Sequence, residues 1–407
     1  MNDRKRILFF AEPATLAHVV RPVLLAAALD QDCYDVIVAT GPDFRKFAVE
    51  ADLKIRDLWA IGTRAYLKAV AAGHPVFPYS VLDRYVREDL RHIENVRPDL
   101  VVGDFRLSLA VSARLANVPY VAISNAYWSP FTPVHFEVPV HLTTRLLGPT
   151  VANYIFAILR PLIFAQHSLP MHRLRKKYGM PSLGFDLRHI FTEADLTLFA
   201  DVPELVPTKD GGVADRYVYI GPITWTPVGS LPAALNQPAD PHPLVYINLG
   251  SSGNPRLLQD IISAVVSFNA RVAVATGGSV LRSSFPDGVV MAEFLPGGEV
   301  AARAKLVICN GGSPSTHQAL QQGTPVLGIP ANLDQLLNMQ FIVACGAGLS
   351  LRGDQVSMER VRHLVQRLLC EPSFGQNAHR IANWFTDYSA TERFAAVVRR
   401  MLTQGHA

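Results

Sequence analysis

Residues 305–340, KLVICNGGSPSTHQALQQGTPVLGIPANLDQLLNMQ, combine a buried strand, a glycine turn and the beginnings of two helices. The apolar run 305–309 ends in a glycine pair, and the missing Cβ atoms let a ligand approach the backbone. The following helix directs its free N–H groups at that ligand, which suits a diphosphate. The next helix opens with Asp334 and Gln335, whose polar side chains can hydrogen-bond a sugar. This stretch predicts a strand–turn–helix unit that binds both groups.

Strands alternate with helical patterns along the whole chain, which predicts α/β architecture with parallel sheets. In the first half we expect strands near residues 6–11, 34–40, 99–103 and 119–123. In the second half we expect them near 244–249, 271–275, 289–291, 305–309 and 325–328. The fold class is therefore two Rossmann-like, doubly wound domains.

The proline-rich segment 221–243 separates the two halves. We expect an N-terminal domain at 1–221, a linker at 222–243, a C-terminal domain at 244–374 and helices at 375–407 that pack toward the first domain. Doubly wound sheets bind ligands at the carboxyl ends of their strands. Two such sheets facing each other would share one cleft, so both halves are expected to supply the active site.

The composition is that of a globular protein, with 407 residues, 49% hydrophobic and 18% charged. The net charge of +4 is small and scattered, which argues against nucleic-acid binding. The four cysteines lack metal-ligand spacing, and the apolar run near the N-terminus is too short for a secretion signal. We expect a cytoplasmic protein with reduced, mostly buried thiols.

The longest apolar region, 146–165, is interrupted by prolines and polar residues. A buried helix pair is the expectation, and an apolar acceptor pocket or a surface in peripheral contact with a membrane are open alternatives.

Two residues of the first half can carry acid–base chemistry. His18 follows the first strand, and Asp104 follows the buried run 100–103, so both lie at carboxyl ends of strands. A neutral histidine can act as general base when a carboxylate fixes its tautomer. The first loop lacks G-x-G-x-x-G, which disfavours a nicotinamide site. The alternatives are a structural His18 and an Asp104 that caps the helix expected at 107–115.

In the second half, Gly250 and Ser251 follow a strand and can lie close to a phosphate or sugar. Phe294 follows a shorter strand and either stacks on a base or fills the core.

The whole chain resembles the nucleotide-sugar-dependent GT-B glycosyltransferases, in particular the UDP-glycosyltransferase and macrolide glycosyltransferase group. That group's His-Gly-Gly-x-Gly-Thr, Glu and Asp-Gln-x-x-Asn pattern stands here as Asn310-Gly-Gly-Ser-Pro-Ser315, Gln318 and Asp334-Gln-Leu-Leu-Asn338, with the same spacing. His18 occupies the place of the group's base, and Asp104 that of its partner.

The resemblance implies an inverting hexosyl transfer from a UDP or dTDP sugar to a hydroxyl of a largely apolar small-molecule or lipid acceptor. His18 would be the general base and Asp104 would orient it. The nucleotide sugar is a co-substrate, and neither a cofactor nor a metal is implied. The implied donor-binding residues are Gly250, Ser251, Phe294, Asn310, Gly311, Gly312, Ser315, Gln318, Asp334 and Gln335.

Three positions depart from the group's pattern on the nucleotide side. Asn310 replaces a diphosphate-binding histidine, and its amide cannot carry charge. Gln318 replaces a glutamate that accepts from both ribose hydroxyls, so a dTDP donor, which lacks the 2′-hydroxyl, becomes more plausible. Pro314 removes one N–H group from the turn.

Apolar and aromatic residues at 59–80 and 125–185 can line an acceptor site or fill a core. The candidate acceptor residues are Trp59, Tyr66, Phe77, Tyr127, Trp128 and Phe131. Two rivals to the transferase stay open: a sugar-nucleotide epimerase of the same fold, and a non-enzymatic partner or nucleotide-binding protein.

Overall fold

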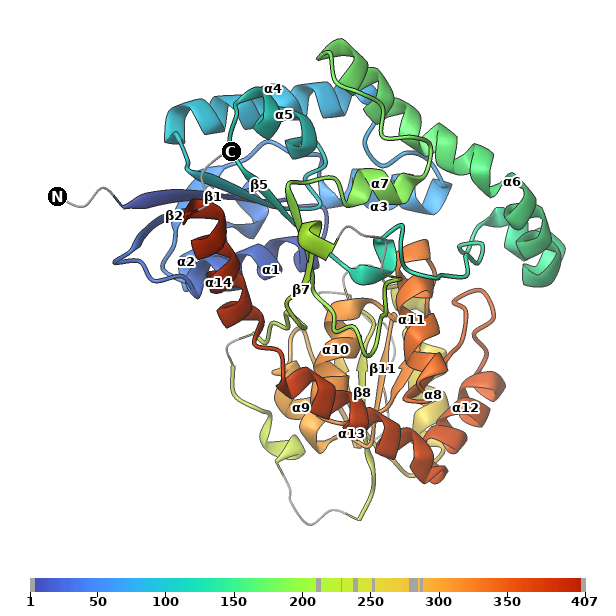
Figure 1. The fold of residues 1–407 in the computed structure, drawn as a ribbon. Coiled ribbons are helices and arrows are strands. Elements are labelled where there is room, and N and C mark those ends of the chain that lie inside the picture. Colours follow the sequence, from blue (N-terminus) through green and yellow to red (C-terminus); the bar gives the residue numbers. More distant parts are fainter. Residues whose placement is uncertain are drawn as a thin grey trace. The chain divides into compact units, whose positions relative to one another are not determined.

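The computed structural model describes residues 4–209, 214–227, 229–236, 241–250, 253–277, 285 and 288–403. Contacts divide the chain into two compact units, each built on one parallel sheet (Figure 1). Unit 1 comprises Met1–Pro133, Ile158–Ile223 and Tyr388–Ala407. Unit 2 comprises Val134–Ala157 and Thr224–Asp387. The expected α/β class with two doubly wound sheets is confirmed.

Unit 1 contains a seven-stranded sheet of order β3-β2-β1-β4-β5-β6-β7 in which all neighbours are parallel. Its strands are β1 (Lys5–Ala11), β2 (Tyr34–Thr40), β3 (Lys54–Asp57), β4 (Leu100–Asp104), β5 (Tyr120–Ser124), β6 (Leu196–Phe199) and β7 (Tyr217–Tyr219). The helices are α1 (Leu16–Ala27), α2 (Arg45–Glu50), α3 (Thr63–Ala72), α4 (Tyr79–Val96), α5 (Leu109–Leu115), α7 (Leu187–Phe191) and α14 (Ala390–Thr403).

The central strands of unit 1 are buried along their length because helices cover the sheet. Part of the core consists of Leu8 and Phe10 from β1, Val101 from β4 and Leu109 from α5. β1 lies between β2 and β4, and Ala11 at its end pairs with Asp104. The loop after β1 and the end of β4 therefore meet at one sheet edge.

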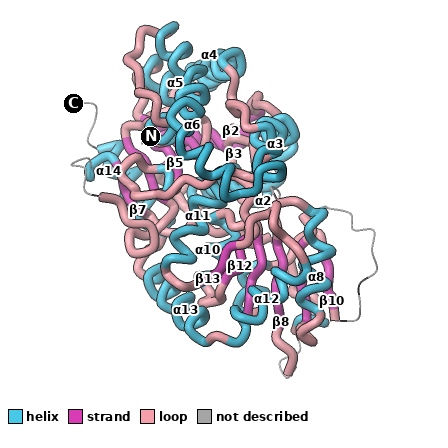
Figure 2. The backbone as a smooth tube through the Cα atoms, turned by 90° about the vertical axis from the view of Figure 1, so that its right-hand side faces the viewer, coloured by secondary structure: helices cyan, strands magenta, loops and turns pink. Residues whose placement is uncertain are grey.

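Unit 2 contains a six-stranded parallel sheet of order β10-β9-β8-β11-β12-β13 (Figure 2). Its strands are β8 (Leu244–Asn248), β9 (Arg271–Ala275), β10 (Val289–Ala292), β11 (Leu306–Cys309), β12 (Val326–Gly328) and β13 (Gly348–Ser350). Its helices are α8 (Leu258–Val266), α9 (Gly297–Arg303), α10 (Ser313–Gln321), α11 (Leu333–Ala344), α12 (Met358–Cys370) and α13 (Pro372–Thr386). Because β8 and β11 are neighbours, the turns after them lie side by side.

All nine strands expected from the sequence are present, and within the described residues four further strands were missed: β3, β6, β7 and β13. Each is only three or four residues long, which is too short to show a clear alternation. β3 is also largely exposed and charged, as suits a strand at the sheet edge.

The contacts differ from the expected domain boundaries in two places. Val134–Ala157 belongs to unit 2, where the Arg352 guanidinium donates to the Val138 carbonyl at 2.7 Å and Thr144 donates to Asp354 at 2.6 Å. At the other end, α13 belongs to unit 2 and α14 to unit 1. Long-range hydrogen bonds and packing determine which unit each of these segments belongs to. Neither boundary coincides with a change in amino-acid composition.

The region 146–165 is not buried as expected. It spans a kink in α6 (Leu142–Lys177), where non-helical dihedral angles at Gly148 (φ 76°, ψ 156°) separate two helical segments. Leu146, Ile158 and Leu162 are exposed. An apolar sequence predicted burial, but only one side of α6 is covered.

The thiols are free, as expected, but they are not mostly buried. Cys309 is buried and Cys345 is half-buried, whereas Cys33 and Cys370 are exposed. Both exposed thiols lie at the margins of elements, Cys33 just before β2 and Cys370 at the end of α12.

Candidate functional site

His18 and Asp104 form a hydrogen-bonded pair in unit 1. His18 lies in the first turn of α1, and Asp104 is the last residue of β4. The His18 Nδ1 atom lies 2.8 Å from Asp104 Oδ1. Asp104 is fully buried, whereas the His18 side chain keeps 18% of its surface exposed. The geometry thus supplies a carboxylate-oriented histidine at the carboxyl end of the sheet.

Asp104 does not cap α5, which begins at Leu109 with Ser108 in the cap position. Its second partner is Arg21, which lies one turn after His18 on α1 and was not anticipated. The Arg21 Nε and Nη2 atoms each donate to one Asp104 oxygen at 2.8 Å. The i, i+3 spacing of His18 and Arg21 on one helix face was the available signal.

The ends of two further strands complete this cluster. Arg21 Nη1 donates to Asn125 Oδ1 at 2.8 Å, and Asn125 Nδ2 donates to Asp201 Oδ2 at 3.0 Å. Asn125 follows β5 and Asp201 comes two residues after β6. Side chains at four neighbouring positions of the sheet therefore hold one another in place.

Charge in the cluster keeps Asp104 ionised. Burial alone would raise the pKa of Asp104, but the Arg21 cation and His18 hold it below its usual range. The carboxylate can thus accept a hydrogen bond from the His18 ring throughout the neutral range.

Phe105, which the sequence analysis overlooked, connects His18 to the candidate acceptor residues. Its ring stacks on the His18 imidazole, with centroids 4.6 Å apart and an interplanar angle of 10°. The Tyr66, Phe77 and Phe191 rings contact Phe105 at centroid distances of 6.0, 5.5 and 5.5 Å. Its φ of 58° is unusual for a residue other than glycine. Strained backbone of this kind gathers at functional sites.

Trp128 reaches the same group through Phe191, at 4.7 Å, and Tyr127 lies 6.4 Å from Trp128. Tyr127 is fully buried and therefore belongs to the core in this structure. The Phe131 ring instead contacts Tyr217 of β7 at 5.8 Å.

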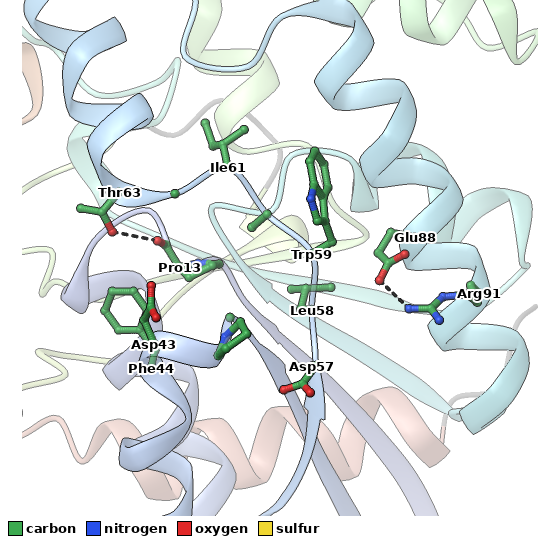
Figure 3. A pocket seen from close by; sticks show the side chains of 14 residues that line it. Pro13, Asp43, Phe44, Asp57, Leu58, Trp59, Ile61, Thr63, Glu88 and Arg91 are labelled. Atoms are coloured by element: carbon green, nitrogen blue, oxygen red, sulfur yellow. Dashed lines mark hydrogen bonds and ion pairs between the residues drawn. The ribbon is translucent and has the colours of Figure 1, made fainter.

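Trp59 lines a cavity at the ends of the first three strands (Figure 3). The cavity has a volume of about 360 Å³, and its walls include Pro13, Phe44, Leu58 and Thr63. Trp59 is linked to the ring group indirectly, because it contacts Tyr85 at 5.5 Å and Tyr85 contacts Phe77 at 5.6 Å.

A second buried ionic cluster supports the loop after β1. Arg106 is fully buried and pairs with Glu12 at 2.8 Å and with Asp89 at 2.9 Å. Burial raises the pKa of Glu12 despite this pairing. The Tyr85 hydroxyl also donates to Glu12 at 2.7 Å. These bonds connect β1, α4 and the residues after β4.

In unit 2, Asn310 lies at the centre of the predicted diphosphate turn. Its Oδ1 accepts from the Gly312 N–H group at 3.0 Å. A Cβ atom on Gly250 would lie 3.1 Å from Asn310 Nδ2, so the turns after β8 and β11 meet here. Gly311 has a φ of +83°, and a Cβ there would come within 2.7 Å of Met339. Ser251 lies outside the described residues.

The turn is tied to α11 by Asn338, the last residue of the Asp-Gln-x-x-Asn motif. Its Nδ2 donates to the Gly311 carbonyl at 2.7 Å and to Thr316 Oγ1 at 2.9 Å. Ser315 lies half-buried in the first turn of α10. Asn338, four residues after Asp334, therefore shapes the turn.

Gln318 is buried on α10 and points toward the segment before β8. Its Nε2 donates to the Trp225 carbonyl at 2.9 Å and to Thr226 Oγ1 at 3.1 Å. Phe294 does not fill the core, because 42% of its surface is exposed.

Asp334 and Gln335 differ in their surroundings. Asp334 is half-buried in the first turn of α11. Gln335 is buried, and its Oε1 accepts from the Ala331 and Asn332 N–H groups at 2.9 and 3.3 Å. The Asn332 side chain completes a capping box. Gln335 thus fixes the helix start that presents Asp334.

Among the described residues, no group of three or more His, Cys, Asp or Glu side chains is arranged to hold a metal ion. The polar chemistry of unit 1 is that of a histidine paired with a buried carboxylate beside aromatic rings, and that of unit 2 is a glycine turn at a helix start.

Comparison with known proteins decides the family. Residues 259–400 match the family described as Erythromycin biosynthesis protein CIII-like, C-terminal domain. A PGL/p-HBAD biosynthesis glycosyltransferase of Mycobacterium tuberculosis (strain ATCC 25177 / H37Ra) is 42% identical over 94% of this chain and 89% of its own length. The protein belongs to this glycosyltransferase family.

A second relative of the glycosyltransferase is a PGL/p-HBAD biosynthesis rhamnosyltransferase of Mycobacterium bovis (strain BCG / Pasteur 1173P2). It is 40% identical over 94% of this chain and 84% of its own length. These relatives support an enzyme and a transferase, as the sequence resemblance implied.

Among solved structures, the glycosyltransferase resembles the spinosyn rhamnosyltransferase SpnG, whose structures include complexes with thymidine diphosphate and with spinosyn aglycone. The TM-score is 0.69 at 21% identity, over 97% of this chain and 99% of SpnG. The likeness shows that the two chains share a fold, the GT-B arrangement of two parallel-sheet domains.

Proposed function

We propose that this glycosyltransferase moves a sugar from a nucleotide diphosphate sugar to an acceptor hydroxyl with inversion at the anomeric carbon. The observation that carries the proposal is the 2.8 Å contact between His18 Nδ1 and Asp104 Oδ1. This contact selects the tautomer with hydrogen on Nδ1 and leaves Nε2 to accept a proton.

In the proposed step, the acceptor hydroxyl gives its proton to His18 Nε2 and its oxygen attacks the anomeric carbon. The bond from that carbon to the diphosphate oxygen breaks, and its electron pair leaves with the nucleotide diphosphate. Asp104 stabilises the resulting imidazolium. The backbone at Gly311 and Gly312 and the first turn of α10, with Ser315, would stabilise the charge of the leaving group. The step needs no cofactor or metal.

A dTDP sugar is the donor that we favour over a UDP sugar. The Gln318 amide has one acceptor oxygen, and its Nε2 donates to Trp225, so it serves two ribose hydroxyls poorly. A relative that is a PGL/p-HBAD biosynthesis rhamnosyltransferase and a fold neighbour solved with thymidine diphosphate agree with this choice. Phe294 would stack on the base, and Asp334 would bind sugar hydroxyls.

The acceptor that we propose is a largely apolar small molecule or lipid. Support comes from the aromatic group that surrounds Phe105 beside His18, in which Tyr66 and Phe77 take part. The PGL/p-HBAD glycosyltransferases among the relatives and the aglycone complex of SpnG are consistent with it.

The first test is a thermal-shift series with dTDP, UDP and GDP. Preferential binding of dTDP should raise the melting temperature more than UDP does at the same concentration. Stabilisation by none of the three would contradict the donor site. A mass-spectrometric screen of dTDP-rhamnose and UDP-glucose with phenolic and lipid acceptors then reads transfer directly.

Replacing His18 by Ala should lower transfer by about 10²–10⁴-fold while dTDP binding is kept, because only the proton acceptor is lost. His363→Ala, an exposed histidine on α12, is the matched control and should keep full activity. Unchanged transfer by His18→Ala would rule out its role as the base.

Gln318→Glu should move donor preference toward UDP, because a carboxylate can accept from both ribose hydroxyls. The ratio of kcat/KM for the UDP and dTDP forms of one sugar measures the effect. An unchanged ratio, with thermal stability maintained, would show that position 318 does not determine the preference between the ribose and deoxyribose donors.

A further inference from the structure

The outer face of α6 is apolar and uncovered. After the kink at Gly148, its largest exposures are 77% at Ile158, 73% at Tyr154 and 69% at Leu162. Successive helix residues turn by about 100°, so residues 151, 155, 158, 162 and 169 lie along one line of the helix. These residues are all exposed aliphatic side chains and form a stripe roughly 27 Å long. We call this stripe, with Tyr154, the α6 outer face.

The opposite side of α6 is already covered by protein. Phe156, Phe164, Met171 and Leu174 are buried on that side. The C-terminal end is also anchored, because Arg175 Nη1 donates to the Ala110 carbonyl at 3.4 Å and Lys177 pairs with Asp83. α6 is the one helix of the described residues long and apolar enough to cross a membrane, yet this anchoring favours a helix that lies on a surface.

The charge on α6 has one sign. The helix contains six Lys and Arg residues and no Asp or Glu. Arg145 lies before the outer face, Arg173 and Lys176 follow it, and all three are exposed. Long basic side chains can extend toward lipid phosphates while their stems stay in apolar surroundings.

We propose that the α6 outer face docks on the surface of a bilayer that contains anionic lipids. The apolar stripe would enter the boundary between headgroups and acyl chains, and the flanking basic residues would bind lipid phosphates. A second copy of this chain fits less well, because two α6 helices packed together would oppose like charges. The docking rests on α6 alone, and its use in reaching a lipid acceptor rests on the proposed function.

The test is flotation of the full-length protein with phosphatidylcholine vesicles and with vesicles that also contain phosphatidylglycerol. The wild type should bind the anionic vesicles better and should be released by high salt. The double variant Ile158→Gln/Leu162→Gln should bind at least about tenfold more weakly, since two exposed aliphatic side chains no longer insert. Arg173→Gln/Lys176→Gln should weaken binding to the anionic vesicles alone, by about fivefold per charge.

The matched control is Val49→Gln/Met358→Gln, which removes two exposed apolar side chains elsewhere and should bind like the wild type. The proposal would be overturned if this control lost as much vesicle binding as the α6 variant, or if the α6 variant bound vesicles like the wild type. It would also be overturned if the wild type formed a dimer that the α6 variant does not form. Retention after alkaline carbonate extraction would also overturn it, because it indicates a spanning helix.

Transfer to a short, water-soluble acceptor should be unchanged in the α6 variant, whereas transfer to the same acceptor headgroup embedded in vesicles should fall. Flotation needs no activity, so failure of the docking and failure of the proposed transfer chemistry give different results.

Discussion

Arg21 determines how much of the Asp104 carboxylate is available to His18. The guanidinium occupies both carboxylate oxygens, while His18 shares one of them. A bidentate, buried cation also holds the carboxylate in a single orientation. Arg21 is thus a positioning residue: it acts on the proposed base through Asp104.

Arg21→Met should lower kcat for transfer while KM for the donor is kept, because Asp104 loses the guanidinium fork that holds it in one orientation toward His18. Steady-state kinetics on the folded variant measure the two constants separately. An unchanged kcat would show that Arg21 does not position the pair.

The same change should lower stability by about 3–5 kcal/mol, because it leaves a buried carboxylate short of its partner. In the wild type, the pKa of Asp104 is lower in the folded protein than in the unfolded chain. The ionised carboxylate therefore stabilises the fold at pH values above the unfolded-state pKa, and this stabilisation is lost as the pH falls through the folded-state pKa. Arg21→Lys keeps the positive charge but not the two-pronged guanidinium. Its free energy of unfolding in urea should therefore lie between those of the wild type and Arg21→Met.

At the scale of elements, the glycine turn after β11 is formed by two segments. The strand β11 and the glycine pair form its backbone, and α11 holds it through the Asn338 amide. Position 311 accepts only glycine without strain, because Gly311 has a positive φ and Met339 from α11 fills the space where a Cβ atom would lie.

Asn338→Ala should weaken dTDP binding and lower stability by about 1–3 kcal/mol, because the Gly311 carbonyl and Thr316 hydroxyl lose a buried donor. Isothermal titration and urea denaturation measure the two effects. Val343→Ala, an exposed position on the same helix, should leave both unchanged. Full dTDP affinity in Asn338→Ala would show that the turn keeps its shape without α11.

At the scale of the whole molecule, the chain crosses between its units more than once. Unit 2 takes Val134–Ala157 from the first half, and unit 1 takes the C-terminal α14. Phe394 of α14 is fully buried in unit 1, with its ring 5.8 Å from Phe9 of β1. Neither unit is therefore a continuous piece of chain.

Phe394→Ala should destabilise unit 1 by about 3–5 kcal/mol, the cost of a large cavity in a core. Limited proteolysis with peptide mapping should show earlier cleavage within 4–133, and calorimetry should give a lower melting temperature. Arg399→Ala, exposed on the same helix, is the control. Equal protection of the two variants would show that α14 adds little to unit 1.

The sequence predicted the parts of the site that depend on local order. His18 and Asp104 follow buried strands, and adjacent parallel strands place such residues at one edge, where the structure finds them 2.8 Å apart. The glycine turn and the start of α11 were predicted for the same reason. Phe105 gave no such signal, because neither its positive φ nor its stacking on His18 shows in a single sequence.

By itself, the amino-acid sequence determined two parallel α/β sheets and the strands β1, β4 and β11 that precede the site residues, because periodicity is a local property of the chain. Its motif resemblance implied the glycosyltransferase family. Only the tertiary structure decided that Arg21 shares Asp104 with His18, that Asn338 holds the Gly311 carbonyl, and that the apolar α6 leaves one face uncovered. Each of these depends on which segments pack together across long stretches of sequence, and an apolar residue reads the same whether protein, lipid or water lies beside it.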